Sequence, residues 1–194
     1  MSLLIAFMAT SLSFAADSST ELRNLGDSAR SIRVTVPVGD VTVTRDASLT
    51  DIELRTTPIN WDSTCELEVL GALRARVQVK RPVLPRHECA MSIDLRLPPG
   101  VALTVNLDDG DAALNGLVSD ARINLGEGNL SLTDVRSELT VRMGNGQITG
   151  THSSQMVDMT LTNEKVTLDG VSQIAADTAD SADSADGDRV SEEL

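Results

Sequence analysis

Four consecutive blocks of eighteen residues decide the fold: LTVNLDDGDAALNGLVSD (103–120), ARINLGEGNLSLTDVRSE (121–138), LTVRMGNGQITGTHSSQM (139–156) and VDMTLTNEKVTLDGVSQI (157–174). Apolar residues recur at shared positions and alternate with polar ones, as in strands with one buried face. The shared positions are Leu103, Ala121, Leu139 and Val157; Val105, Ile123, Val141 and Met159; Leu107, Leu125, Met143 and Leu161; Ala112, Leu130, Ile148 and Val166; Leu114, Leu132, Gly150 and Leu168. A single block cannot bury its apolar side, whereas stacked blocks share a core. The repeat therefore predicts an all-β fold, a β-solenoid or β-helix of 18-residue coils.

Each block contains a corner between its two strands. Glycine supplies the positive φ that a tight corner needs, and Asn163 can substitute in the last block. The predicted structural turn glycines are Gly39, Gly110, Gly128 and Gly146.

An earlier segment follows the same pattern. Ile32 to Val43 matches the positions of Leu103 to Leu114, so the predicted domain covers residues 30–174. The stretch of about 61–97 departs from the period and predicts an inserted, hairpin-like excursion of two or three strands.

The two ends of the chain differ from its middle. Residues 1–15 are apolar and end in small residues, which predicts a secretory signal peptide, with no transmembrane segment after its cleavage. Residues 175–194 place aspartates at a period of three and predict a disordered acidic tail. Export makes a Cys65–Cys89 disulfide the expected pairing; two buried free thiols are the alternative.

Composition excludes one class of partner. The formal net charge is −13, and Trp61 is the sole aromatic residue after the predicted signal peptide. Nucleic-acid binding needs a basic footprint and usually several aromatic faces, so we expect no nucleic-acid partner.

The run IDLRLPPGVALTVNLDDGD (93–111) resembles an adhesin-like domain family of unknown function from bacterial cell-envelope proteins. Members similarly show a strand, a Pro-Gly turn and then repeated strand units joined by Gly-Asp or Asn-Gly corners. The resemblance covers about residues 32–174 and leaves the cysteine-containing excursion unmatched. It implies a β-helical or β-solenoid fold, a periplasmic or extracellular setting and no assigned enzymatic residues.

Candidate binding residues gather in the excursion. Its basic cluster consists of Arg74, Arg76, Lys80, Arg81 and Arg86. The cluster could contact an anionic glycan, lipopolysaccharide or a membrane surface, or it could be the solvated face of a hairpin strand. Trp61 could stack on a sugar or fill the core.

Other chemistry has little support. Carboxylates at the corners thin out from Asp109 and Glu127 to Asn145, so solvated turn residues are favoured over calcium ligands. We expect no catalytic residues, no metal site and no cofactor, because no catalytic or ligand spacing is present.

Three functions follow as hypotheses. The first is a non-enzymatic envelope protein, an adhesin-like scaffold or binding surface, with an envelope protein or an anionic glycan as partner. The second is a polysaccharide-active β-helix enzyme, and the third a module that binds proteins by strand-edge augmentation. Because specificity usually lies where a repeat breaks, the excursion is the expected partner surface. The oligomeric state stays open.

Overall fold

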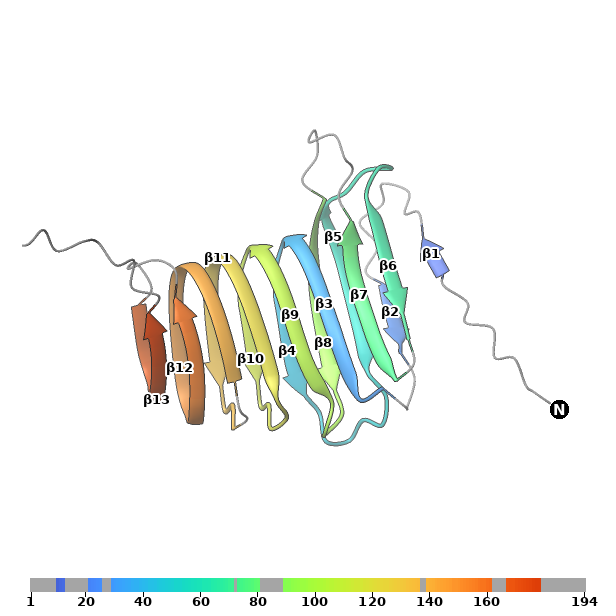
Figure 1. Ribbon diagram of the computed structural model, residues 1–194. Helices are drawn as coiled ribbons and strands as arrows, with labels where there is room; N and C mark the ends of the chain where they lie inside the picture. The colour runs from blue at the N-terminus through green and yellow to red at the C-terminus, as the bar shows by residue number, and fades with distance from the viewer. Residues whose placement is uncertain are drawn as a thin grey trace, which may run out of the picture.

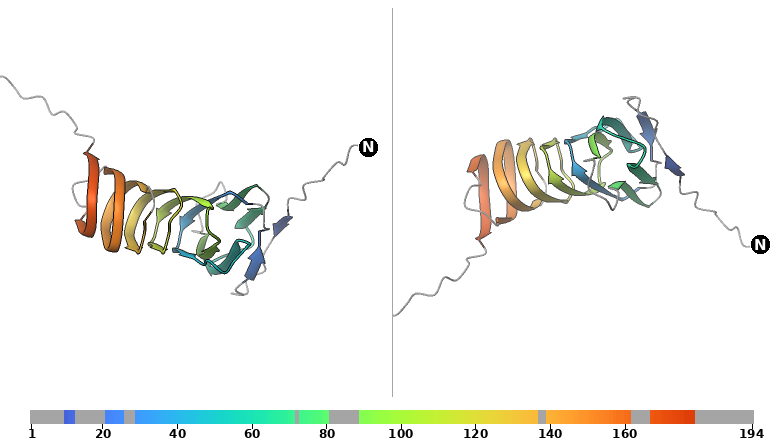
Figure 2. Two further views of the ribbon diagram at one scale, coloured as in Figure 1. Left: turned by 90° about the horizontal axis from the view of Figure 1, so that it is seen from below. Right: turned by 90° about the horizontal axis from the view of Figure 1, so that it is seen from above.

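The computed structural model describes residues 10–12, 21–25, 29–71, 73–80, 89–136, 139–161 and 167–178, with side chains described between residues 23 and 150. These residues form a single 13-stranded sheet without a helix. The strands are β1 (Thr10–Leu12), β2 (Glu21–Asn24), β3 (Ser31–Val38), β4 (Val41–Arg45), β5 (Glu53–Asn60), β6 (Glu66–Leu70), β7 (Arg74–Lys80), β8 (Ala90–Leu97), β9 (Ala102–Asp109), β10 (Ala112–Asn115), β11 (Ala121–Thr133), β12 (Leu139–Leu161) and β13 (Thr167–Thr178). The sheet is elongated, with β13 at one end and β1 at the other (Figure 1, Figure 2).

Six parallel strands close on themselves in the order β3, β9, β11, β10, β4 and β8. β11 belongs to two sides of this ring because its first half pairs with β9 and its second half with β10. The register contact between Val38 of β3 and Ala90 of β8 closes the ring. The remaining strands extend it: β12 and β13 beyond β11, β7 and β6 beyond β3, and β5 and β2 beyond β8.

The prediction of an all-β protein is therefore confirmed, but the β-solenoid or β-helix prediction is wrong. The described fold is a closed six-stranded parallel barrel with additional strands. The physical reason lies in the pairing of the early strands. In the predicted solenoid, each coil would pair with the next coil along the chain. Instead, Ile32 of β3 pairs with Leu103, and Val41 of β4 pairs with Ile93, both much later in the chain.

The excursion was also placed wrongly as an insertion. β6 and β7 form an antiparallel hairpin, as expected, but β8 is a member of the ring beside β4. Met91, Ile93 and Leu95 are fully buried, so β8 supplies core that the ring needs. The Cys65–Cys89 disulfide is present, with a Cα–Cα distance of 5.6 Å, and joins the start of β6 to the start of β8. Closing a loop of this sequence separation of 24 stabilises a fold by about 3 kcal/mol in the chain-entropy model.

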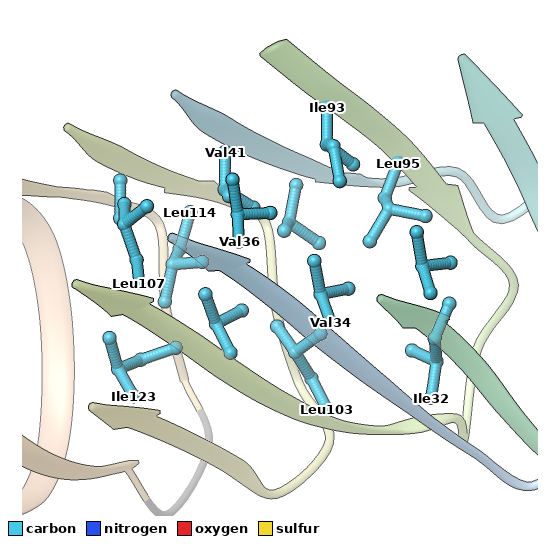
Figure 3. Packing of buried hydrophobic residues seen from close by; sticks show 14 of the residues in the cluster. Ile32, Val34, Val36, Val41, Ile93, Leu95, Leu103, Leu107, Leu114 and Ile123 are labelled. Carbon is cyan, nitrogen blue, oxygen red and sulfur yellow. The ribbon is translucent and has the colours of Figure 1, made fainter. Parts of the chain in front are cut away.

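The predicted columns are confirmed between the first three blocks. Leu103, Ala121 and Leu139 are register partners, as are Ala112, Leu130 and Ile148. Their side chains are buried inside the sheet. Figure 3 shows side chains from β3, β4, β8 and β9 meeting between the strands, among them Val34, Val41, Ile93 and Leu107.

The fourth block departs from the predicted register. Ile148 pairs with Leu168, two residues beyond the predicted Val166, and the pairing shifts again further along β12 and β13. Between the second and third blocks, where the predicted register is kept, the two backbones approach closely at a pair of glycines. A Cβ on Gly146 would overlap the carbonyl oxygen of Gly128 in the preceding block. The next residue in this column of the sequence is Glu164, which lies with residues 162–166 outside the described residues.

The predicted ends of the domain are only partly described. Within the predicted signal peptide, β1 pairs antiparallel with β6, and the rest of residues 1–15 lies outside the described residues. β13 includes residues 175–178 of the predicted tail, and residues 179–194 lie outside the described part.

Candidate functional site: the arginine face

One outer face of the sheet is built by β7, β3, β9, β11 and the first part of β12. Along each strand, alternate residues point into the core, so the residues between them point outward. Val34 is fully buried, for example, whereas its neighbour Arg33 is exposed. Arg33, Arg74, Arg76, Arg122 and Arg142 are the exposed arginines of this surface, which we call the arginine face.

Strand register orders the side chains of the arginine face into two ladders that cross the strands. The first, which we call the arginine ladder, consists of Arg76, Arg33, Thr104, Arg122 and Thr140. The second runs Gln78, Thr35, Asn106, Asn124 and Arg142. Each ladder therefore takes one residue from each of five neighbouring strands.

Side-chain hydrogen bonds connect neighbouring residues of the second ladder, which we call the amide ladder. Asn124 donates from Nδ2 to Asn106 Oδ1 at 2.7 Å, and Asn106 donates from Nδ2 to Thr35 Oγ1 at 3.3 Å. These bonds hold the amide groups in a row beside the arginine ladder, which presents a surface with fixed donors and acceptors.

No ion pair joins the five arginines of this face to a carboxylate among the described side chains. None of the five forms an ion pair or hydrogen bond with another described side chain. Two exposed acids nevertheless lie near these arginines: Asp108 lines the same hollow as Arg142, and Asp120 lines the same hollow as Arg122.

Lys80, at the end of β7, is different from these arginines. Its Nζ lies 2.9 Å from Glu68 Oε2 and 3.4 Å from Glu66 Oε1. The hydrogen bond to Glu68, and then the contact with Glu66, raise the pKa of Lys80 above its ordinary value. Lys80 is thus neutralised locally and adds little to an anion-binding surface.

Three shallow hollows lie along the arginine face. A hollow of about 470 Å³ is lined by Asn106, Asn124 and Arg142, and one of about 250 Å³ by Thr104, Arg122 and Thr140. A third, of about 190 Å³, is lined by Arg33, Arg74 and Arg76 and also includes Thr104. Each hollow therefore holds at least one of the five arginines.

The opposite face carries charges that compensate one another. Arg96 on β8 contacts Asp46 at 2.6 Å and Glu53 at 3.2 Å. Hydrogen bonds from Ser48, and to a lesser extent the charge of Arg96, hold the pKa of Asp46 below its ordinary value. Arg55 lies on the same face, opposite Asp94 in the register of β5 and β8.

The structure places the predicted site residues in different parts of the molecule. Arg74 and Arg76 lie on the arginine face, Lys80 lies in the pair of ion contacts described above, and Arg81 and Arg86 are outside the described residues. Trp61 is half-buried and packs against the core after β5, a strand that pairs with β8 and β2 and not with β3 or β7.

Sequence reasoning missed the contribution of Arg33, Arg122 and Arg142. The available signal was the block alignment itself, because all three occupy outward positions of aligned strands. Arg74 and Arg76 of the predicted cluster lie at one end of a larger surface that continues over the repeats.

Two further findings concern the described residues only. No group of three or more His, Cys, Asp or Glu side chains among them is arranged to hold a metal ion. Likewise, no helix in this part of the chain is long and apolar enough to cross a membrane.

Comparison with known proteins gives only distant likeness among solved structures. No family model matches the sequence, and no curated protein matches it. Among solved structures, a similar one is the 1.95 Å crystal structure of a "putative cell adhesion protein" from Clostridium sporogenes ATCC 15579. It is 9% identical with a TM-score of 0.40, and the match covers 81% of this chain and 98% of that one. So distant a likeness transfers neither fold nor function.

Proposed function

We propose that this protein is an exported, non-enzymatic binding protein of the bacterial cell envelope, and that its arginine face contacts an anionic partner. The observation that carries the proposal is the gathering of five exposed arginines, without ion pairs among the described residues, on one face of a chain whose net charge is −13. The adhesin-like resemblance of the sequence supports the envelope setting.

Placing several arginines close together on one face lowers the stability of the protein on its own. Arg33 and Arg76 are direct register partners on adjacent parallel strands, and like charges directly opposite each other destabilise a sheet. An anionic partner would relieve this repulsion. The planar guanidinium group suits carboxylate, sulfate and phosphate because it donates two parallel hydrogen bonds.

The cysteines support export. A buried disulfide persists in oxidising compartments and is rare in the bacterial cytosol. The predicted signal peptide points to the same compartment, which would be the periplasm or the exterior.

Chromatography on a sulfopropyl cation exchanger at pH 7 tests this function. A chain of net charge −13 should not be retained by a negative matrix unless a local basic face binds it. We expect retention of the wild-type protein at low salt and loss of retention for the double variant Arg33→Ser/Arg122→Ser.

The matched control is Arg55→Ser/Arg136→Ser, which removes the same two charges away from the arginine face. Arg55 lies on the opposite face, and Arg136 contacts Asp134 at 2.7 Å in a corner. This control should elute close to the wild type. Flow-through of the wild type, or identical elution of the two double variants, would contradict the proposal.

A further inference from the structure

We infer that the anionic partner is a linear acidic polysaccharide that lies across the strands, along the two ladders of the arginine face. This inference rests on the proposed function and names the class of its ligand. It is carried by the direction in which the arginines are arranged, by the amide ladder beside them and by the hollows that join them.

The arginines are spaced for an extended ligand. Neighbouring strands of a sheet lie about 4.8 Å apart, so Arg76 and Arg122, three strands apart, are separated by about 14 Å across the sheet. Arg142 lies one strand further, in the second ladder, so the arginines of the two ladders span about 19 Å across the strands. A small anion can contact one or two of these groups, whereas a linear polymer with a charge on successive units can contact all of them.

The second ladder suits sugar hydroxyl groups. Thr35, Asn106 and Asn124 form a row of hydroxyl and amide groups with both donor and acceptor capacity. This row runs parallel to the arginine ladder and ends at Arg142. A polymer that carries carboxylates along one edge and hydroxyl groups along the other is complementary to both ladders.

The three hollows lie next to one another, so that one extended polymer could occupy all of them. The hollow around Arg33 and the hollow around Arg122 share Thr104. Asn106, two residues further along β9, lines the hollow of about 470 Å³ around Arg142. Sugar rings seated in successive hollows would place their acidic groups beside successive arginines.

Other polyanions fit this face less well. Nucleic acid carries one charge per ~1.7 Å of helix axis, and so dense an anion would be repelled by the chain's net charge of −13. The described outward residues of the two ladders also include no aromatic ring on which bases could stack. A membrane surface would be expected to meet apolar side chains as well as arginines, and the two ladders carry none.

The experiment measures binding of the full chain to polygalacturonate by isothermal titration calorimetry at low salt. Fully methyl-esterified polygalacturonate is the control polymer because it has the same backbone without the charges, and the galacturonate monomer tests the need for length. We expect binding of the acidic polymer, none of the ester, and much weaker binding of the monomer.

Variants then locate the site. Arg33→Ser/Arg122→Ser should weaken polygalacturonate binding about tenfold, whereas Arg55→Ser/Arg136→Ser should leave it within about twofold. Asn124→Ala should weaken polygalacturonate binding while leaving elution from the sulfopropyl matrix unchanged, because it removes a hydrogen-bonding group and no charge. Circular dichroism and the melting temperature of each variant confirm that it is folded.

The outcomes separate the inference from the proposed function. Binding of phosphatidylglycerol vesicles or polyphosphate through Arg33 and Arg122, with no binding of polygalacturonate, would overturn the polysaccharide inference and leave the anion-binding function in place. An absence of binding to all of these anions would overturn both. Equal binding of the acidic polymer and its ester would also overturn the inference, since the arginines would then have no role.

Discussion

Replacing Gly128 with alanine should cost more than about 4 kcal/mol in the free energy of unfolding, or prevent folding altogether. Gly128 has a φ of +130°, and a Cβ at this position would overlap the carbonyl oxygen of Gly110 in the neighbouring block. The added atom would meet backbone and could not be accommodated by rotating a flexible side chain. The strands β9 and β11 would have to move apart at the corner, which would break the register on both sides of it.

Gly100→Ala is the matched control for this substitution. Gly100 also has a positive φ, +84°, but no atom lies within 4 Å of where its Cβ would be. The control should therefore show only the backbone strain of a non-glycine residue, about 1–2 kcal/mol. Urea denaturation followed by circular dichroism measures both variants. A loss of the same size for Gly128→Ala and Gly100→Ala would show that the corners do not stack as described.

The second large effect is expected at Leu130, in the second half of β11. Leu130→Asp should destabilise the protein by about 3–5 kcal/mol, because the carboxylate would be buried without a partner. Leu130 is 0% exposed and lies in register between Ala112 of β10 and Ile148 of β12. At neutral pH the unfolded chain would be favoured by the cost of burying the charge.

Its neighbour provides the control. Ser131 lies on the same strand, and its side chain is exposed. Ser131→Asp should change the free energy of unfolding by no more than about 0.5 kcal/mol, as surface substitutions usually do. Comparable losses in melting temperature for Leu130→Asp and Ser131→Asp would refute the assignment of inward and outward sides along β11.

The sequence predicted local structure better than topology. Alternation places Leu103, Val105 and Leu107 in the core because the physics of a half-buried strand leaves a period of two in the chain. The match between Ile32 and Leu103 was visible for the same reason, and the structure pairs them. Closure of the ring was not visible, because the contact between Val38 and Ala90 leaves no periodic trace in the sequence.

The fourth block shows a limit of reading columns alone. Apolar residues continue in the predicted columns, but Glu164 replaces the glycine whose missing side chain allows the close approach at Gly146. The described register pairs Ile148 with Leu168, two residues beyond the position that the apolar columns predict.

The candidate site was predicted in part. Arg74 and Arg76 were recognised because they lie close together in the sequence. Arg33, Arg122 and Arg142 belong to other strands, and they reach the same face through the pairing of β7 with β3, of β3 with β9, of β9 with β11 and of β11 with β12. The sequence pattern also did not show that Lys80 contacts two carboxylates of β6 across the hairpin.

Arginine-specific modification tests the central claim most directly. Phenylglyoxal reacts with exposed guanidinium groups, and mass spectrometry measures the rate at each arginine with and without polygalacturonate. Binding at the arginine face predicts that Arg33, Arg76 and Arg122 react several-fold more slowly in the presence of the polymer, whereas the rate at Arg55 is unchanged. Equal protection of all four residues, or protection of Arg55 alone, would contradict the assignment of the binding surface to this face.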